Sequence, residues 1–383
     1  MWSVIRALQG ESPACEDNFA ESRYERNQRC ILMHEMKRYP RSLDPEIFTR
    51  PFGELEYEKV RAWMLDDRVG RRRQAVDHLL ELYVLQRENV IRSLRYGFLD
   101  VLLSTLHNDE SEEMRCKSAE ALAFLLRETK GLDMLLAMDD EGGTVGKLLK
   151  ALDDPSKEVV ILVLRVTIAC RAAYNAYEAT VRLVKYGFIE RCIALLRHEE
   201  VRVSATACSA LATIFSVKEA FIRFIRSGGM AEVTEALKRN GVFVASEAAE
   251  VVTQAAVYRL GKKAAVNHCT LVALRPYMTH DNLRVRTAVT GAVAQLTIYE
   301  PGKQQAVDEN IAPILLELLM HEEERDVLVN VLKTFVNVAE HPAGRRQLLG
   351  AKDRLQFIAR EADDYQPLNL SVAEALSQLE RKC

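Results

Sequence analysis

One glycine-rich string has the residue types of a phosphate-binding loop. The sequence Glu-Gly-Gly-Thr-Val-Gly-Lys covers residues 141–147, and loops of this kind bind phosphates through backbone N–H groups and a lysine. However, only three residues separate Gly142 from Gly146, whereas the phosphate loop needs four, and no Ser or Thr follows Lys147. The string also follows no strand pattern. We therefore predict a turn between helices at this point.

The histidines and cysteines could supply metal ligands or nucleophiles, but their spacing argues against both. The eight histidines lie mostly in polar turns without an H-E-x-x-H motif, and no C-x-x-C occurs among the eight cysteines. His268–Cys269 is the only adjacent pair, and no nucleophile-elbow serine or paired-carboxylate motif is present. The sequence therefore predicts a protein that is not an enzyme and that has no metal and no cofactor. Several cysteines lie inside apolar helical runs, which is typical of small buried hydrophobic residues.

The composition narrows the class of protein further. Of the 383 residues, 48% are apolar and 28% are charged, as in a folded, soluble chain. The formal charge of −3 argues against bulk nucleic acid or an anionic membrane as the main partner. No apolar run approaches the roughly 18 residues of a membrane span, and residues 1–19 do not show the basic region and long apolar core expected of a secretory signal. Scattered cysteines favour a reducing compartment, the cytoplasm.

Two sets of markers recur along the chain at a nearly constant interval. The first set is a glycine in the same local context, at positions whose numbers differ by 41 and 42: Gly261, Gly302 and Gly344. The second set consists of turn positions, which follow one another at steps of 46, 44, 42, 39 and 42: Gly97, Gly143, Gly187, Gly229, His268 and Asn310. Gly53 and Gly350 extend this set at its two ends. A short amphipathic segment ends at each turn, a second begins after it, and a longer one follows a polar turn.

Three helices per repeat of this length indicate an all-α fold. We predict a right-handed armadillo-repeat superhelix, an α-solenoid of about seven to eight three-helix repeats over residues 49–383, with the two-helix HEAT repeat as the alternative. Small residues in the third helices let neighbouring repeats approach closely. Residues 1–48 do not join the pattern. They are either an N-terminal cap or tail, or an anchoring arm that becomes ordered on a partner.

The third helices are where a peptide-binding groove would lie. Armadillo proteins of the importin type place a Trp and, four residues later, an Asn on each groove-facing helix, and the Asn amide can hold an extended peptide backbone. The Asn position here holds Glu81, Phe124, Ala169, Thr213, Gln254, Gln295, Asn337 and Gln378. The Trp position holds Asp77, Glu120, Arg165, Ser209, Glu250, Gly291, Lys333 and Glu374. Since no Trp is present, importin-like cargo binding is disfavoured.

The last four repeats nevertheless carry an unbroken amide series at steps of 41, 42 and 41, formed by Gln254, Gln295, Asn337 and Gln378. A polar, half-exposed helix position often holds Gln or Asn without any binding role. The alternative is that this half of the groove binds an extended partner segment, and Lys333, one turn before Asn337, belongs to the same candidate set.

A second candidate is the basic run Arg71, Arg72 and Arg73 at the head of a helix. It is either ordinary solvated surface or a docking patch for an acidic surface such as tubulin or a nucleic acid.

Three segments carry a family resemblance: residues 42–106, which include the element Asp44–Pro45, and residues 310–349 and 367–380. They resemble the two ends of the radial spoke head 14 homologue family, armadillo proteins of ciliary axonemes in which an Asp–Pro element also precedes the first repeat. The resemblance implies a structural subunit of the radial spoke, in the cytoplasm and the axoneme of a cilium or flagellum. Its partners would be other radial spoke or axonemal proteins, with the doublet microtubule surface as a further partner. The family has no catalytic residues.

The alternative function is a soluble armadillo adaptor or transport receptor that binds an extended client peptide in its concave groove.

Overall fold

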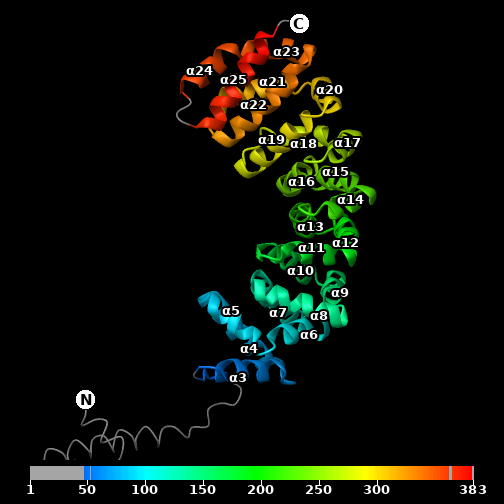
Figure 1. Ribbon diagram of the computed structural model, residues 1–383, viewed down its shortest axis with the longest axis vertical. Helices are drawn as coiled ribbons and strands as arrows, with labels where there is room; N and C mark the ends of the chain where they lie inside the picture. Colours follow the sequence, from blue (N-terminus) through cyan, green and yellow to red (C-terminus); the bar gives the residue numbers. More distant parts are fainter. Residues whose placement is uncertain (1–46, 52, 362–364, 382–383) are drawn as a thin grey trace, which may run out of the picture. The chain divides into compact units, whose positions relative to one another are not determined.

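The computed structural model describes residues 47–51, 53–361 and 365–381, and all their regular elements are helices (Figure 1). The chain divides into two compact units, the first ending at Ala75 and the second starting at Val76, so helix α4 (Val69–Leu85) runs through the division. Residues 1–46 lie outside the described residues. The domain division proposed at residue 48 therefore stays a prediction.

In the described part of the first unit, several side chains contact Trp63 on α3 (Leu55–Met64). The ring of Phe48 packs edge-on against Trp63 with 5.0 Å between centroids, and the Phe48 N–H donates to Gln74 Oε1 at 2.8 Å. The Lys59 ammonium lies 4.9 and 5.3 Å from the two ring centroids and donates to Thr49 O at 2.6 Å. Cation–π contacts of this kind stabilise the packing of residues 48 and 49 against α3.

The described part of the second unit contains seven helix triplets after α4. The first helices are α5 (Arg87–Leu94), α8 (Thr129–Gly142), α11 (Ala176–Lys185), α14 (Lys218–Arg226), α17 (Arg259–Asn267), α20 (Glu300–Asp308) and α23 (Pro342–Leu348). The second helices are α6 (Phe98–Asn108), α9 (Thr144–Lys150), α12 (Phe188–Leu195), α15 (Gly229–Asn240), α18 (Thr270–Leu274), α21 (Ala312–His321) and α24 (Lys352–Glu361). The third helices are α7 (Glu112–Arg127), α10 (Lys157–Ala169), α13 (Val201–Ile214), α16 (Val242–Ala255), α19 (Leu283–Thr297), α22 (Arg325–Glu340) and α25 (Gln366–Glu380).

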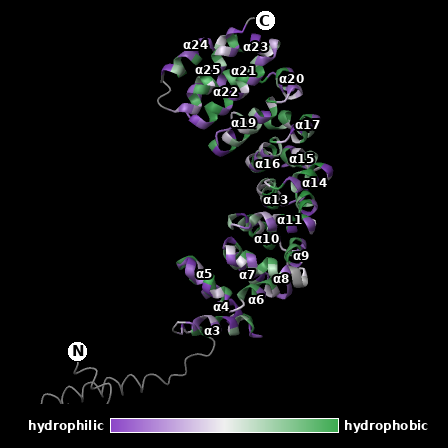
Figure 2. Cartoon of the chain, viewed as in Figure 1, coloured by the Kyte–Doolittle hydropathy of each residue, from purple (hydrophilic) through white to green (hydrophobic). Residues whose placement is uncertain are grey.

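Each third helix packs against the next one, from α7 through α25. Small residues make this close approach possible, because Ala207, Ala248, Ala249 and Ala292 are fully buried between neighbours. Hydrophobic residues recur along all the triplets and are interleaved with hydrophilic ones (Figure 2). A single repeat cannot bury its apolar face alone, so the core is continuous through the stack.

The turns between first and second helices explain the second set of markers. Gly97 and Gly187 have φ angles of +72° and +82°, a left-handed conformation that is favourable only without a Cβ. Two predicted positions are wrong by one residue. The left-handed residues are Gly228 (φ +72°) and Cys269 (φ +54°), so the turn positions from Gly187 to Asn310 recur at equal steps. Asn310 (φ +52°) lies where predicted, and Asn tolerates this conformation better than most residues.

The first set of markers has a different role, which is helix packing. Gly131, Gly261, Gly302 and Gly344 are each the third residue of a first helix. A Cβ on any of them would lie 2.0–2.3 Å from a carbonyl oxygen near the end of the preceding third helix. Only glycine permits this approach, so these residues set the distance between consecutive repeats. The predicted turn at the phosphate-loop-like string is confirmed, because Gly143 (φ +64°) joins α8 to α9.

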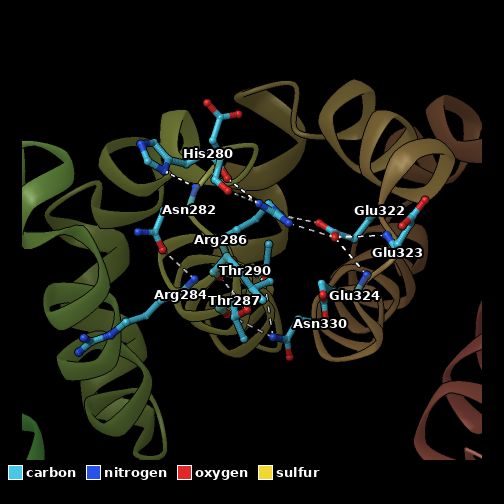
Figure 3. Close-up of polar contacts among 12 residues, drawn as sticks. His280, Asn282, Arg284, Arg286, Thr287, Thr290, Glu322, Glu323, Glu324 and Asn330 are labelled. Carbon is cyan, nitrogen blue, oxygen red and sulfur yellow. Dashed lines mark hydrogen bonds and ion pairs between the residues drawn. The ribbon is translucent and has the colours of Figure 1, made fainter.

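A largely buried arginine joins consecutive repeats near the C-terminal end (Figure 3). Arg286 donates to its own turn, at His280 O (2.8 Å) and Asp281 O (3.1 Å), and to the Glu322 carboxylate of the next turn at 2.5 and 3.2 Å. Arg115 repeats the arrangement with Asp109 O, Glu110 O and the Asp154 carboxylate. A bidentate pair of this kind fixes the geometry between two repeats as well as contributing energy.

Candidate binding face

A hollow of about 530 Å³ lies on the face formed by three consecutive third helices, α13, α16 and α19. Its wall consists mainly of short side chains. The lining residues are Ser209, Ala212, Thr213, Ser246, Glu247, Glu250, Arg284, Thr287 and Ala288. Because Ser209, Thr213 and Glu250 occupy the aligned Trp and Asn positions, the hollow lies on the face where the sequence pattern predicted the groove. We call it the central hollow.

The two glutamates of the central hollow have different surroundings. Glu247 accepts a hydrogen bond from Arg284 Nη2 at 2.9 Å and another from Ser246 Oγ at 2.7 Å. Glu250 is exposed, and among the described residues it has no hydrogen bond or ion pair. One carboxylate of the hollow is therefore neutralised internally, while the other is available to a bound cationic group.

The helix connection beside the central hollow is unusually short. Only Gly241 separates α15 from α16, with φ +60° and ψ −134°, a region of backbone space that is essentially restricted to glycine. The polar turn predicted between second and third helices is absent here. Phe243, the second residue of α16, is 74% exposed and occupies the helix position that Arg202 and Arg284 hold in the neighbouring third helices.

The predicted amide series does not share one environment. Gln254 is exposed and Gln295 is half-buried. Asn337 Nδ2 donates to Ala294 O and to Thr297 Oγ1, both at 3.1 Å, so its amide N–H groups join α22 to α19. Gln378 is only 8% exposed, and its Oε1 is buried without a hydrogen-bond partner. Gln254 and Gln295 are thus the accessible members, and the binding role of the series stays a prediction.

Two further side chains of α22 complete the description of this region. Asn330, seven residues or about two helical turns before Asn337, donates through Nδ2 to Thr287 O (3.3 Å) and Thr290 Oγ1 (3.5 Å). It therefore makes the same kind of contact with α19 as Asn337 does. Lys333 of the predicted set is exposed, and it has no ion pair among the described residues. On α22, the exposed Lys333 ammonium group therefore lies between two amides, Asn330 and Asn337, that already donate hydrogen bonds to α19.

The three arginines of the predicted basic patch belong to the first unit and are not equivalent. Arg71 lies 5.0 Å from the Trp63 ring and donates to Asp66 Oδ2 at 2.9 Å. Arg72 is half-buried, and its Nη1 donates to Asp66 O (3.1 Å) and Asp67 O (2.9 Å). Only Arg73 is exposed. Two of the three guanidinium groups therefore stabilise the α3–α4 turn, and docking through this run stays a prediction.

Sequence reasoning did not include Ser209, Thr213, Glu247 and Glu250 in the candidate set. The comparison with importin-type grooves searches for Trp and Asn, whereas this surface is defined by the absence of large side chains. A usable signal was present, because α13 contributes Ser209 and Thr213 to the hollow and α19 contributes Ala288, and all three side chains are short. Short residues on the third helices before and after α16 leave space on the outer surface.

Among the described residues, the buried cysteines are poorly suited to covalent chemistry, and no metal-binding cluster is present. No group of three or more His, Cys, Asp or Glu side chains among them could hold a metal ion. Burial raises the pKa of the Cys170 thiol to about 12 and also raises the pKa values of Cys192 and Cys208, which disfavours the reactive thiolate. In this part of the chain, no helix has the length and apolar character needed to cross a membrane.

Comparison with known proteins identifies the class of fold. No protein-family model and no curated protein sequence matches the chain. Among solved structures, an engineered protein matches with a TM-score of 0.74 at 20% identity, over 85% of this chain and 79% of the other. A designed armadillo repeat protein in complex with the peptide (KR)4 matches with a TM-score of 0.56 at 22% identity, over 63% and 99%.

A third match comes from a structure that describes a phosphorylation switch controlling the interaction between cadherin and beta-catenin. It has a TM-score of 0.63 at 16% identity, over 85% of this chain and 60% of the other. Together with the helix triplets, these similarities confirm the predicted fold, which is an armadillo-repeat α-solenoid.

Proposed function

We propose that the protein is a scaffold that binds an extended segment of another protein across its third-helix face. The observation that carries this proposal is the central hollow, which is lined by short side chains on three consecutive third helices. A hollow of this size accommodates several side chains of an extended segment, and the neighbouring helices continue the surface on both sides. The similar designed armadillo repeat protein, which was solved with a bound peptide, supports the same interpretation.

The position of the binding surface can be tested by filling the central hollow. Ser209→Trp places a large ring between α13 and α16, and Glu235→Trp on the exposed surface of α15 is the matched control. We expect the first variant to weaken binding of a partner at least tenfold, because its chain can no longer lie against the helices, and the control to bind normally. Equal binding by both variants, with unchanged circular dichroism, would contradict the proposal.

For the assembly in which the scaffold works, we propose the radial spoke of the ciliary or flagellar axoneme. This part rests on the resemblance of residues 42–106, 310–349 and 367–380 to the radial spoke head 14 homologue family. The alternative is a soluble adaptor or transport receptor that binds a client peptide. Fractionation distinguishes them, because a spoke subunit stays with detergent-extracted axonemes and is released by high salt. An adaptor is released with the cytosol, and that result would reject the axonemal assignment.

A further inference from the structure

One row of positions along the third helices carries charges of alternating sign. The row is the aligned Trp position from α7 to α25, and we call it the charge row: Glu120, Arg165, Ser209, Glu250, Gly291, Lys333 and Glu374, on α7, α10, α13, α16, α19, α22 and α25. Asp77, at the aligned position on α4, forms an ion pair with Lys117 and is not part of the row. Its five charged members are all exposed. Ser209 and Glu250 line the central hollow, which places the row on the proposed binding face.

Several other charges on the third helices are paired between repeats, whereas those of the charge row form no ion pair among the residues that the structure describes. Arg202 donates to Glu158 at 2.7 Å, Arg284 to Glu247 at 2.9 Å, and Lys117 to Asp77 at 2.6 Å. Among the described residues, Glu250 and Lys333 form no ion pair and no hydrogen bond. Unpaired charges flanked by neutralised ones produce local potentials that a complementary partner can match.

The geometry of the stack converts the charge row into a spacing along a partner chain. Neighbouring packed helices lie about 8–10 Å apart, so the two steps from α16 to α22 cover roughly 16–20 Å. An extended chain advances about 3.3 Å per residue, which corresponds to about five or six residues. Gly291, between Glu250 and Lys333, has no side chain that could block the path.

We propose that the partner segment is an extended peptide with a basic side chain at Glu250 and an acidic side chain about five or six residues away, at Lys333. This inference rests on the proposed function and specifies the chemistry of the segment. Two opposite charges at a fixed separation determine both the register and the direction of the bound chain, because reversing the peptide brings like charges together at both ends.

The test uses the full chain and three fluorescein-labelled ten-residue peptides of the same neutral composition. One has Arg before Asp with five residues between them, one has Asp before Arg at the same separation, and one has the two charges adjacent. Binding is measured by fluorescence anisotropy at low ionic strength, because screening weakens exposed pairs. We expect the protein to prefer one spaced peptide about tenfold over the other two, as two exposed ion pairs would give.

The decisive variant carries Glu250→Lys together with Lys333→Glu, and it should prefer the other spaced peptide. Its control exchanges two exposed charges on first helices, Glu219→Lys with Lys263→Glu, and should keep the original preference. Thermal unfolding of both variants checks that the fold is intact. The inference is overturned if the protein does not discriminate between the spaced peptides, or if exchange in the charge row does not reverse the preference.

Failure of this inference can be distinguished from failure of the proposed function. If Ser209→Trp weakens a partner but exchange of Glu250 and Lys333 does not, the third-helix face binds the partner without the proposed charge pattern. If neither change affects partner binding, the proposed function itself fails.

Discussion

The α19–α22 pair and the α13–α16 pair both consist of third helices from consecutive repeats, but they use different interactions. Asn330 and Asn337 donate from α22 to α19, and the largely buried Arg286–Glu322 ion pair also joins α19 to the turn before α22. Between α13 and α16, by contrast, no side-chain hydrogen bond is present among the described residues, and the buried contacts come from residues such as Ala207, Cys208 and Ala248. The first pair is fixed by polar contacts, whereas the second is packed by small apolar groups and leaves an open outer surface. The difference separates a region of the solenoid fixed by polar contacts from the region that we propose for binding.

Breaking the buried ion pair should have the largest effect on the polar region. Glu322→Ala leaves the Arg286 guanidinium without its carboxylate partner. The side chain of Arg286 is only 17% exposed and that of Glu322 only 5%. We expect a loss of about 3 kcal/mol in unfolding free energy, measured by urea denaturation. Arg284→Ala, in a pair whose arginine is exposed, should change stability by less than about 1 kcal/mol. Similar losses in both variants would remove the proposed distinction between the regions.

The glycine contacts should matter equally in both regions. Gly261→Ala and Gly302→Ala each place a Cβ 2.0–2.2 Å from a carbonyl oxygen of the preceding third helix, and overpacking of this kind costs about 1–3 kcal/mol. Gly70→Ala is the control, because no atom lies within 4 Å of its added Cβ and alanine favours the helix. A destabilised Gly70→Ala, or a harmless Gly302→Ala, would contradict the packing explanation.

Removal of one amide should have a moderate effect that is specific to the polar region. Asn337→Ala loses two hydrogen bonds to α19, which together correspond to about 1–2 kcal/mol. Gln254→Ala, at the aligned but exposed position on α16, should change stability by less than about 0.5 kcal/mol. Amide hydrogen exchange in α19 and α22 would show whether the loss is local. Equal effects at the two positions would argue against the contrast.

The smallest expected effect is a dependence on pH. Burial by itself would raise the pKa of Glu322, but hydrogen bonds from Arg286 and from the Glu324 N–H outweigh it, and the pKa lies below its ordinary value of 4.5. A lowered pKa stabilises the fold above pH 4.5, and this contribution is lost as the pH falls through the folded-state value. The wild type should therefore lose more stability than Glu322→Gln between pH 5 and pH 3. Parallel pH profiles would show that this carboxylate does not contribute.

The fold was predictable because its repeat depends on local residue properties. Left-handed turns require Gly or a tolerant residue, so Gly97, Gly187 and Asn310 were identified by type and spacing. The errors at Gly229 and His268 arose because two adjacent residues fitted the turn pattern, and only the backbone shows that Gly228 and Cys269 adopt the left-handed angle. The glycines at positions 261, 302 and 344 were recognised as a repeat, but their role depends on the position of the preceding helix.

The candidate site was less predictable, because exposure and pairing depend on contacts between repeats. Asn337 and Gln254 have similar side chains at aligned positions, yet one amide bonds to Thr297 and the other is exposed. Their difference arises from the neighbouring helix, because α19 presents the Thr297 hydroxyl and the Ala294 carbonyl to Asn337. Likewise, Arg71 and Arg72 occur in a basic run, and the structure shows that they bind the turn before their own helix.

Site-specific photo-crosslinking provides the most direct test of the binding face. A photoreactive amino acid replaces Thr213 in the central hollow or, as a control, Glu235 on α15, and the crosslinked partner peptide is sequenced. We expect crosslinks from position 213 to one continuous segment of a partner, abolished by Ser209→Trp, and none to that segment from position 235. A partner that remains bound without crosslinking at position 213, or that crosslinks only from position 235, would contradict the proposal that the third-helix face is the binding surface.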